Sequence, residues 1–310
     1  MNAITRPGNL FLFLLLFSAT SARCCINEYR VLLNGRTVYA DGEDMTPSGR
    51  FRSAGSALLA LHESDSIYRL THKTEDYSDY GAMLTYNGQY LAAKQVFLEI
   101  EAGLPGLYAT AANLGTVYEL LGQNDSALFW IKKAITINPD SHEGSEWIHV
   151  RILEAKIAAG ADNNYYATHN LLAVDFGEAK KPVSSDTMDL AKLRYQLYHQ
   201  LSERLTFIKP QDPIMAQLLF QLGNVNALTW DVKSALQVYK VARAYGYTSP
   251  VLDKREKHFR SLQWKADIMS NSRKWAQRNP FWALLLTLAT GVLLLAGLVW
   301  LIKRIRKRLP

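Results

Sequence analysis

Residues 108–139 read YATAANLGTVYELLGQNDSALFWIKKAITINP, and this stretch decides how the rest of the chain is interpreted. Small and large apolar residues recur here at helical spacing, turn-forming residues divide the stretch at 122–124, and a proline closes it. The pattern predicts two antiparallel helices joined by a short turn. The positions that carry it are Leu114, Gly115, Tyr118, Ala127, Ile131, Ala134 and Pro139.

The pattern occurs a second time at a fixed offset of 34 residues. Glycine, alanine and proline are identical at this offset, and large side chains are kept beside them. A glycine in each first helix predicts a close approach of the paired helices, and each proline ends a second helix. The earlier copy contains Tyr80, Gly81, Leu84, Ala93, Phe97 and Pro105.

These positions resemble the tetratricopeptide repeat (TPR) pattern, apart from Ala111, where that pattern often has tryptophan. The resemblance implies an all-α fold: a right-handed helical solenoid built from helix pairs of about 34 residues each. It also implies that the concave face, lined by the first helices, binds a protein or peptide partner. The array is expected over 51–250, with its clearest repeats at 74–107 and 108–141 and a fair repeat at 216–249.

The resemblance also suggests groove residues. Asn113 stands where the family often binds a peptide backbone, and Thr116, Trp147, Arg151 and Glu154 are expected to continue the groove. For Trp147 itself, packing is favoured over a role in the groove. The family's clamp for C-terminal carboxylates is not expected here, because its positions hold Ser78, Ala82, Glu143 and Trp147.

Elsewhere in the array the pattern is weaker. Residues 51–73 have helical spacing, and 141–159 are expected to form one long helix with a second helix over 162–176. After a linker at 180–185, a helix is expected over 185–207, capped by Ser185 or Asp186. The expected apolar positions of the first of these helices are Ala57, Leu58, Leu61, Ile67 and Leu70, and those of the last are Met188, Leu190, Leu193, Leu197 and Leu201.

Residues 23–50 differ from the array and are expected to be extended. Two short apolar runs flank Asn34-Gly35, a dipeptide typical of hairpin turns. The segment is interpreted either as a short strand pair or as an ordered cap on the first helices.

Both ends of the chain are apolar. Residues 1–22 are interpreted as a signal peptide, because Arg6, the apolar run Leu10–Phe17 and a group of small residues follow one another in the order of such signals. Residues 280–302 are expected to be a single transmembrane helix that contacts the lipid bilayer through 281–302. That run has 22 residues without a charge, which reach roughly 33 Å as a helix.

This layout predicts a single-pass membrane protein. The N-terminal domain is expected on the exported side, as the periplasmic side of a bacterial inner membrane, with the basic tail 303–310 in the cytoplasm. Residues 251–279 are expected to be a charged juxtamembrane helix. The alternative is a cytosol-facing, tail-anchored adaptor similar in layout to the mitochondrial fission adaptor, against which the run Leu10–Phe17 argues.

The formal charge of +7 does not indicate nucleic acid binding. Five basic residues gather in the last eight positions, and a basic face over the array is therefore not expected. The two cysteines, Cys24 and Cys25, are adjacent and offer no disulfide framework.

No catalysis and no cofactor are expected, because the chain has no glycine-rich phosphate loop, no nucleophile motif and no paired cysteine ligands. His142, Glu146 and His149 do have a spacing that suits three metal ligands. A metal-dependent enzyme using 142–149 is thus a less favoured alternative to the polar start of a surface helix. Glu203 and Asp212 are interpreted as solvated charges.

Overall fold

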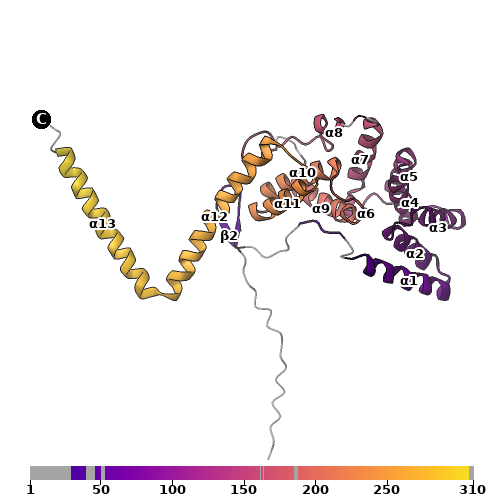
Figure 1. The fold of residues 1–310 in the computed structure, drawn as a ribbon, viewed down its shortest axis with the longest axis horizontal. Coiled ribbons are helices and arrows are strands. Elements are labelled where there is room, and N and C mark those ends of the chain that lie inside the picture. Colours follow the sequence, from indigo (N-terminus) through magenta and orange to yellow (C-terminus); the bar gives the residue numbers. More distant parts are fainter. Residues whose placement is uncertain are drawn as a thin grey trace, which may run out of the picture.

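The computed structural model describes residues 29–39, 46–49, 53–160, 162, 164–184 and 188–306. Antiparallel helices follow one another in a row, and two long helices leave the end of that row (Figure 1). The strands are β1 (Tyr29–Val31) and β2 (Thr37–Tyr39). The helices of the described residues are α1 (Ala54–Thr71), α2 (Thr74–Tyr86), α3 (Tyr90–Gly103), α4 (Tyr108–Leu120), α5 (Asn124–Ile137), α6 (Ser141–Gly144), α7 (Glu146–Ala159), α8 (Tyr165–Thr168), α9 (Leu190–Phe207), α10 (Pro213–Thr229), α11 (Val232–Ala244), α12 (Pro250–Arg278) and α13 (Pro280–Arg306).

The predicted helix pairs are present as α2–α3 and α4–α5, with a further pair α10–α11. Each pair is closed by a glycine in the first helix against a large side chain in the second. A Cβ atom at Gly81 would lie 2.8 Å from the Phe97 ring, and one at Gly115 would collide with Ile131. The turns also use glycine, at Gly88 and Gly122, with φ near 75°. The pattern therefore predicted the interior of these pairs correctly.

The third unit departs from the prediction. The single helix expected over 141–159 is interrupted, because His142 and Glu143 have φ of 53° and 59°, and α7 begins only at Glu146. The helix expected over 162–176 is wrong beyond α8. Asn170 bonds the backbone at Leu172 and Val174 there and holds the chain in a non-helical turn.

The chain after α8 is irregular but not solvent-exposed. Leu171, Leu172, Val174 and Phe176 are all buried and pack against the same cluster as α7, α9 and α10. The helix expected from 185 begins at Leu190, because Asp189 accepts hydrogen bonds from the amides of residues 191 and 192. Met188 lies outside α9 and is exposed, which corrects the predicted apolar stripe.

The strands β1 and β2 pair antiparallel, with Arg30 opposite Val38. Val31 is buried between α11 and α12, in the cluster that contains Tyr239 and Phe259. The segment thus packs on the last helices of the array, and the interpretation as a cap on the first helices is wrong. Helix α1 lies at the opposite end of the row (Figure 1).

Helix α1 packs through only part of the apolar face that the sequence predicted. Ala57 and Leu61 are buried, whereas Leu58, Ile67 and Leu70 are 48%, 42% and 84% exposed. Because α1 is the terminal helix of the row, it has a neighbour on one side only.

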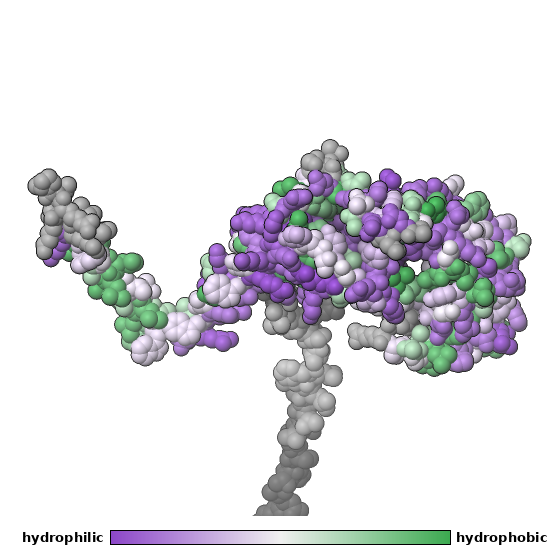
Figure 2. All heavy atoms as spheres, turned by 45° about the horizontal axis from the view of Figure 1, so that its top comes forward, coloured by the Kyte–Doolittle hydropathy of each residue, from purple (hydrophilic) through white to green (hydrophobic). Residues whose placement is uncertain are grey.

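Helix α13 contains the predicted apolar span. Its stretch Pro280–Trp300 is long and apolar enough to cross a membrane, and none of it is buried in the protein. Figure 2 shows α13 as a mostly apolar rod apart from the array. The helix continues to Arg306, so the expected tail 303–310 begins as helix. The predicted signal peptide at 1–22 lies outside the described residues.

Candidate functional site

A pocket of about 120 Å³ lies among helices that are far apart in sequence. It is named here the α4–α9 pocket, and its walls come from α2, α4, α6, α7 and α9. Helices α2 and α4 are the first helices of two repeats, and α9 closes the side where the repeat pattern fails. The pocket is lined by Ala82, Thr85, Tyr86, Ala112, Asn113, Thr116, Glu119, Leu120, His142, Glu146, His149, Gln200, Glu203, Arg204, Phe207 and Ile208.

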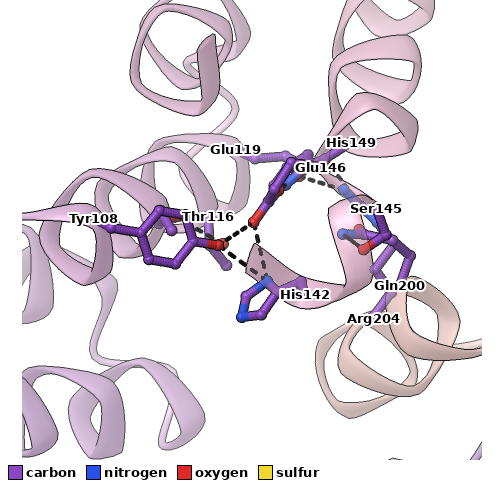
Figure 3. A network of polar contacts seen from close by, with 10 residues as sticks. Tyr108, Thr116, Glu119, His142, Ser145, Glu146, His149, Gln200 and Arg204 are labelled. Carbon is purple, nitrogen blue, oxygen red and sulfur yellow. Dashed lines mark hydrogen bonds and ion pairs between the residues drawn. The ribbon is translucent and has the colours of Figure 1, made fainter. Parts of the chain in front are cut away.

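The floor of the pocket is a buried carboxylate, Glu119 of α4 (Figure 3). Arg204 of α9 donates to both of its oxygens, over 2.9 and 3.0 Å. Lys156 and His149 of α7 each approach one of these oxygens to 2.6 Å. One carboxylate therefore joins three helices, and such charge-assisted, two-pronged contacts fix orientation strongly.

The surroundings of Glu119 keep it ionised. Burial by itself raises the pKa of a carboxyl group, but the charges of Arg204, His149 and Lys156 and the hydrogen bond with His149 outweigh this effect. The pKa of Glu119 is consequently held well below its ordinary value.

A second buried carboxylate, Glu146 of α7, lies beside the first. Tyr108 donates a hydrogen bond to Glu146 over 2.8 Å, and His142 Nδ1 lies 3.0 Å from the same oxygen. His149 Nδ1 is 3.6 Å from the other oxygen. Burial raises the pKa of Glu146, yet the hydrogen bonds with His142 and His149 overcome it and lower that pKa strongly.

The histidines of this cluster respond in opposite directions. The hydrogen bond with Glu146 raises the pKa of His142 above its ordinary value. Burial lowers the pKa of His199, whose ring lies 4.6 Å from that of His142, and the charge of His142 lowers it further. The pair therefore favours one protonated ring beside Glu146 and one neutral ring on α9.

This geometry corrects one sequence-based interpretation. His142, Glu146 and His149 do not form the polar start of a surface helix, since Glu146 and His149 are only 4% and 6% exposed. Their polar atoms point at one another and at Glu119. Across the described part of the chain, no group of three or more His, Cys, Asp or Glu side chains is placed to hold a metal ion.

The rim of the pocket is aromatic and acidic. The rings of Tyr86 and Phe207 stack at 5.2 Å between centroids and join α2 to α9. Glu203 lies beside them, 3.5 Å from the Tyr86 hydroxyl, and is only partly exposed. Glu203 is thus part of the pocket and not a solvated surface charge. Asp212, the other residue interpreted in that way, caps α10 through the Met215 amide.

The structure separates the predicted groove residues into two groups. Asn113 and Thr116 line the α4–α9 pocket. Trp147 is instead half-buried against α9, where its indole donates to Gln196 over 3.0 Å. Arg151 and Glu154 lie near Lys132 of α5, away from the pocket, with Glu154 3.2 Å from that lysine. Trp147, Arg151 and Glu154 are therefore not pocket residues.

The sequence-based prediction missed the residues that build the pocket. Glu119, Arg204, Tyr86 and Phe207 were not expected there, because each looks like an ordinary helix residue. One signal was available: Arg204 follows Leu193, Leu197 and Leu201 in the apolar register of α9. A charge at a core position predicts a buried partner.

The helix pairs and the pocket define a TPR-like helical-repeat protein. No family model matches the chain, and no curated protein sequence matches it. One similar solved structure is a tetratricopeptide repeat protein from Parabacteroides merdae ATCC 43184. The similarity has a TM-score of 0.30 at 13% identity and covers 66% of this chain and 93% of that chain. At these values it assigns neither fold nor function, and the fold rests on the helix pairing described above.

Proposed function

We propose that this protein is a membrane-anchored TPR-like scaffold that binds a protein partner through the α4–α9 pocket. The observation that carries the proposal is a pocket on the first helices of two repeats, the side on which a TPR array presents its concave binding face. Partner binding is non-catalytic in this proposal.

The pocket suits an internal peptide segment. Asn113 carries both an amide donor and a carbonyl acceptor and makes no hydrogen bond within the described part of the chain, so it is available to a peptide backbone. Tyr86 and Phe207 offer an aromatic wall, and Glu203 favours a basic or amide side chain over a terminal carboxylate. These features favour an internal peptide segment over a C-terminal carboxylate, in line with the sequence-based expectation that the carboxylate clamp is absent.

Site-specific photocrosslinking in cells tests this binding site. A photoreactive side chain at Asn113 or Thr116 is expected to capture one protein, and the same probe at Glu154, on the α5 side, is expected to capture none. Equal capture from Asn113 and Glu154, or no capture from either pocket position, would contradict the proposal.

The proposed anchor is α13, with the array on the exported side and the tail in the cytoplasm. It is supported by the apolar span Pro280–Trp300 and by the basic residues that follow it. A cytosol-facing array is the alternative. Protease added to spheroplasts distinguishes them: an exported array is digested from the outside, whereas a cytosolic one is protected until the inner membrane is broken.

A further inference from the structure

We propose that residues 264–278, the C-terminal half of α12, form an amphipathic helix that lies in the headgroup region of an anionic membrane surface. This inference rests on the proposed membrane anchor α13, and its own observations come from the side chains of α12.

Helix α12 has two different halves. Its first half packs on the array through Leu252, Arg255 and Phe259, which are all fully buried. Ala266 is the last buried residue of α12, and the helix runs for twelve further residues, to Arg278. The second half therefore projects away from the array, as Figure 1 also shows.

The projecting half carries an apolar face. Trp264, Ile268 and Trp275 are 63%, 44% and 44% exposed, and their spacing of four and seven places them on one side of the helix. Ala266 is two residues from Trp264, about 200° around the helix. The apolar face is therefore opposite the face that packs on the array, and it meets no other part of the array.

The charges beside this face suit anionic headgroups. Residues 264–278 contain four basic residues and the single acid Asp267: Lys265, Lys274 and Arg278 flank the apolar face, whereas Arg273 lies on the opposite side of the helix. These four basic residues make no ion pair within the described part of the chain. Basic residues near an anionic bilayer are attracted to it, and tryptophan prefers the boundary between headgroups and acyl chains.

The apolar face points toward the side on which the bilayer would lie. Trp275 and Ala276 border a shallow hollow whose other wall is Ala283, Leu286 and Thr287 of α13. The apolar face is therefore adjacent, at Trp275, to the side of α13, which is the helix proposed to enter the membrane. With α13 in the bilayer, the tryptophan face is the one that meets lipid, and this continuity favours lipid over a soluble partner.

Spin labels on the full chain in nanodiscs test the proposal. The labels are I268C on the apolar face and Q277C on the opposite face, in a C24S/C25S background, with L288C in α13 as the control for insertion. Collisions with oxygen and with a water-soluble nickel chelate report the depth of each label. Discs contain phosphatidylcholine with or without phosphatidylglycerol.

If the helix lies on the membrane, the label at 268 is buried in lipid in the anionic discs, whereas the label at 277 is in water although it is nearer to α13 in sequence. If the helix lies away from the membrane surface, the label at 277 is deeper than the label at 268, or both labels are in water. Either result overturns the proposal. A label at 268 hidden from both reagents means that protein covers the face, which also overturns it. If the label at 288 is aqueous, the anchor itself has failed.

Charge removal provides a second measurement. Replacing Lys274 and Arg278 by glutamine is expected to lower the ratio of lipid-facing to aqueous label at 268 by roughly fivefold for each charge in anionic discs only. The matched variant K254Q/K257Q, on the first half of the same helix, is expected to leave that ratio unchanged. Equal effects of the two variants would contradict a role for the charges beside the apolar face.

Discussion

The helix pairs α2–α3 and α4–α5 and the helices α9 to α12 bury different kinds of side chain. The first two pairs are closed by glycine, alanine and large apolar residues that lie within one repeat of each other. The later helices bury Arg194, Arg204, Gln221 and Arg255, whose partners lie elsewhere in the chain. Arg204 bonds a residue 85 positions away, and Arg255 one 79 positions away.

The difference shows how a repeat array is completed where its pattern ends. The regular helix pairs use the same contacts between their two helices, so the sequence of each pair is sufficient to specify it. The chain between α7 and α10 has lost that pattern and is held instead by cations that bond carboxylates and backbone carbonyls. The candidate site lies at this junction, between the last regular repeat and α9.

The strongest test of this comparison is Glu119→Leu. It leaves Arg204, Lys156 and His149 without their shared carboxylate, and removal of one member of a buried charge pair costs about 3–5 kcal/mol. Urea unfolding of the detergent-solubilised chain measures the loss. Because the two side chains are coupled, the double variant Glu119→Leu/Arg204→Leu is expected to have a free energy of unfolding about 1–3 kcal/mol higher than Glu119→Leu alone.

The control for that variant is Glu154→Gln, which breaks an exposed pair with Lys132. It is expected to change the unfolding free energy by less than about 1 kcal/mol. If the two glutamate variants cost the same, the buried cluster does not hold α4, α7 and α9 together.

Arg255→Met is expected to release the irregular chain before α9. Arg255 donates to the carbonyls of Phe176, Gly177 and Ala179 and to the Asn224 side chain. Losing these bonds is expected to cost about 2–3 kcal/mol. Hydrogen–deuterium exchange is expected to rise over 170–184 while α2 to α5 stay unchanged.

The matched variant is Arg243→Met, in the neighbouring helix α11, whose arginine bonds the exposed Asp253 and the buried Glu256 of α12. It is expected to leave exchange over 170–184 unaltered. A rise in exchange across the whole array after Arg255→Met would mean that this arginine supports global folding and not one segment.

Gly223→Ala tests the regular pairs. The added methyl group would collide with the Tyr239 ring, which is fully buried and held by a hydrogen bond to Asn224. Overpacking of this kind costs about 1–3 kcal/mol. Gly115→Ala is expected to cost a similar amount, because the added methyl group would collide with Ile131 Cδ1 and Cγ1 and lie 3.3 Å from the Ile131 backbone nitrogen.

Gly103→Ala is the control, since a Cβ atom there meets nothing within 4 Å. It is expected to be neutral or slightly stabilising. Thermal unfolding of the three variants ranks them. A destabilised Gly103→Ala, or a neutral Gly223→Ala, would show that glycine does not act through close helix approach.

The stability of the folded chain is also expected to depend on pH. The lowered pKa values of Glu119 and Glu146 contribute stability above their ordinary value of 4.5, and this is lost as the pH falls through the folded pKa values. The raised pKa of His142 contributes stability below 6.5 that is lost as the pH rises through its folded value. Stability is therefore expected to peak between these limits.

Urea unfolding as a function of pH measures that profile. His142→Asn is expected to remove the decline on the alkaline side and to leave the acid side, which the two glutamates set. If stability still declines in this variant as the pH rises, the decline comes from a group other than His142.

The sequence by itself determined the features that depend on near neighbours. The 34-residue offset predicted the all-α pairs, the glycine contacts at Gly81 and Gly115 and the turns, because both partners of each contact lie in one repeat. The apolar run before Trp300 likewise predicted α13. Asn113 and Thr116, on a regular first helix, line the pocket, and their contact with a partner stays a prediction.

Only the tertiary structure decided the rest of the site. Glu119 has the local sequence of an exposed helix charge, and the apolar register around Arg204 predicts a buried partner without identifying it; only the fold brings these two residues, 85 positions apart, together. Trp147, Arg151 and Glu154 of α7 do not line this pocket, and their part in a binding groove stays a prediction. Which side chains become buried or paired depends on where distant segments of the chain pack. The local periodicity of the sequence does not contain that information.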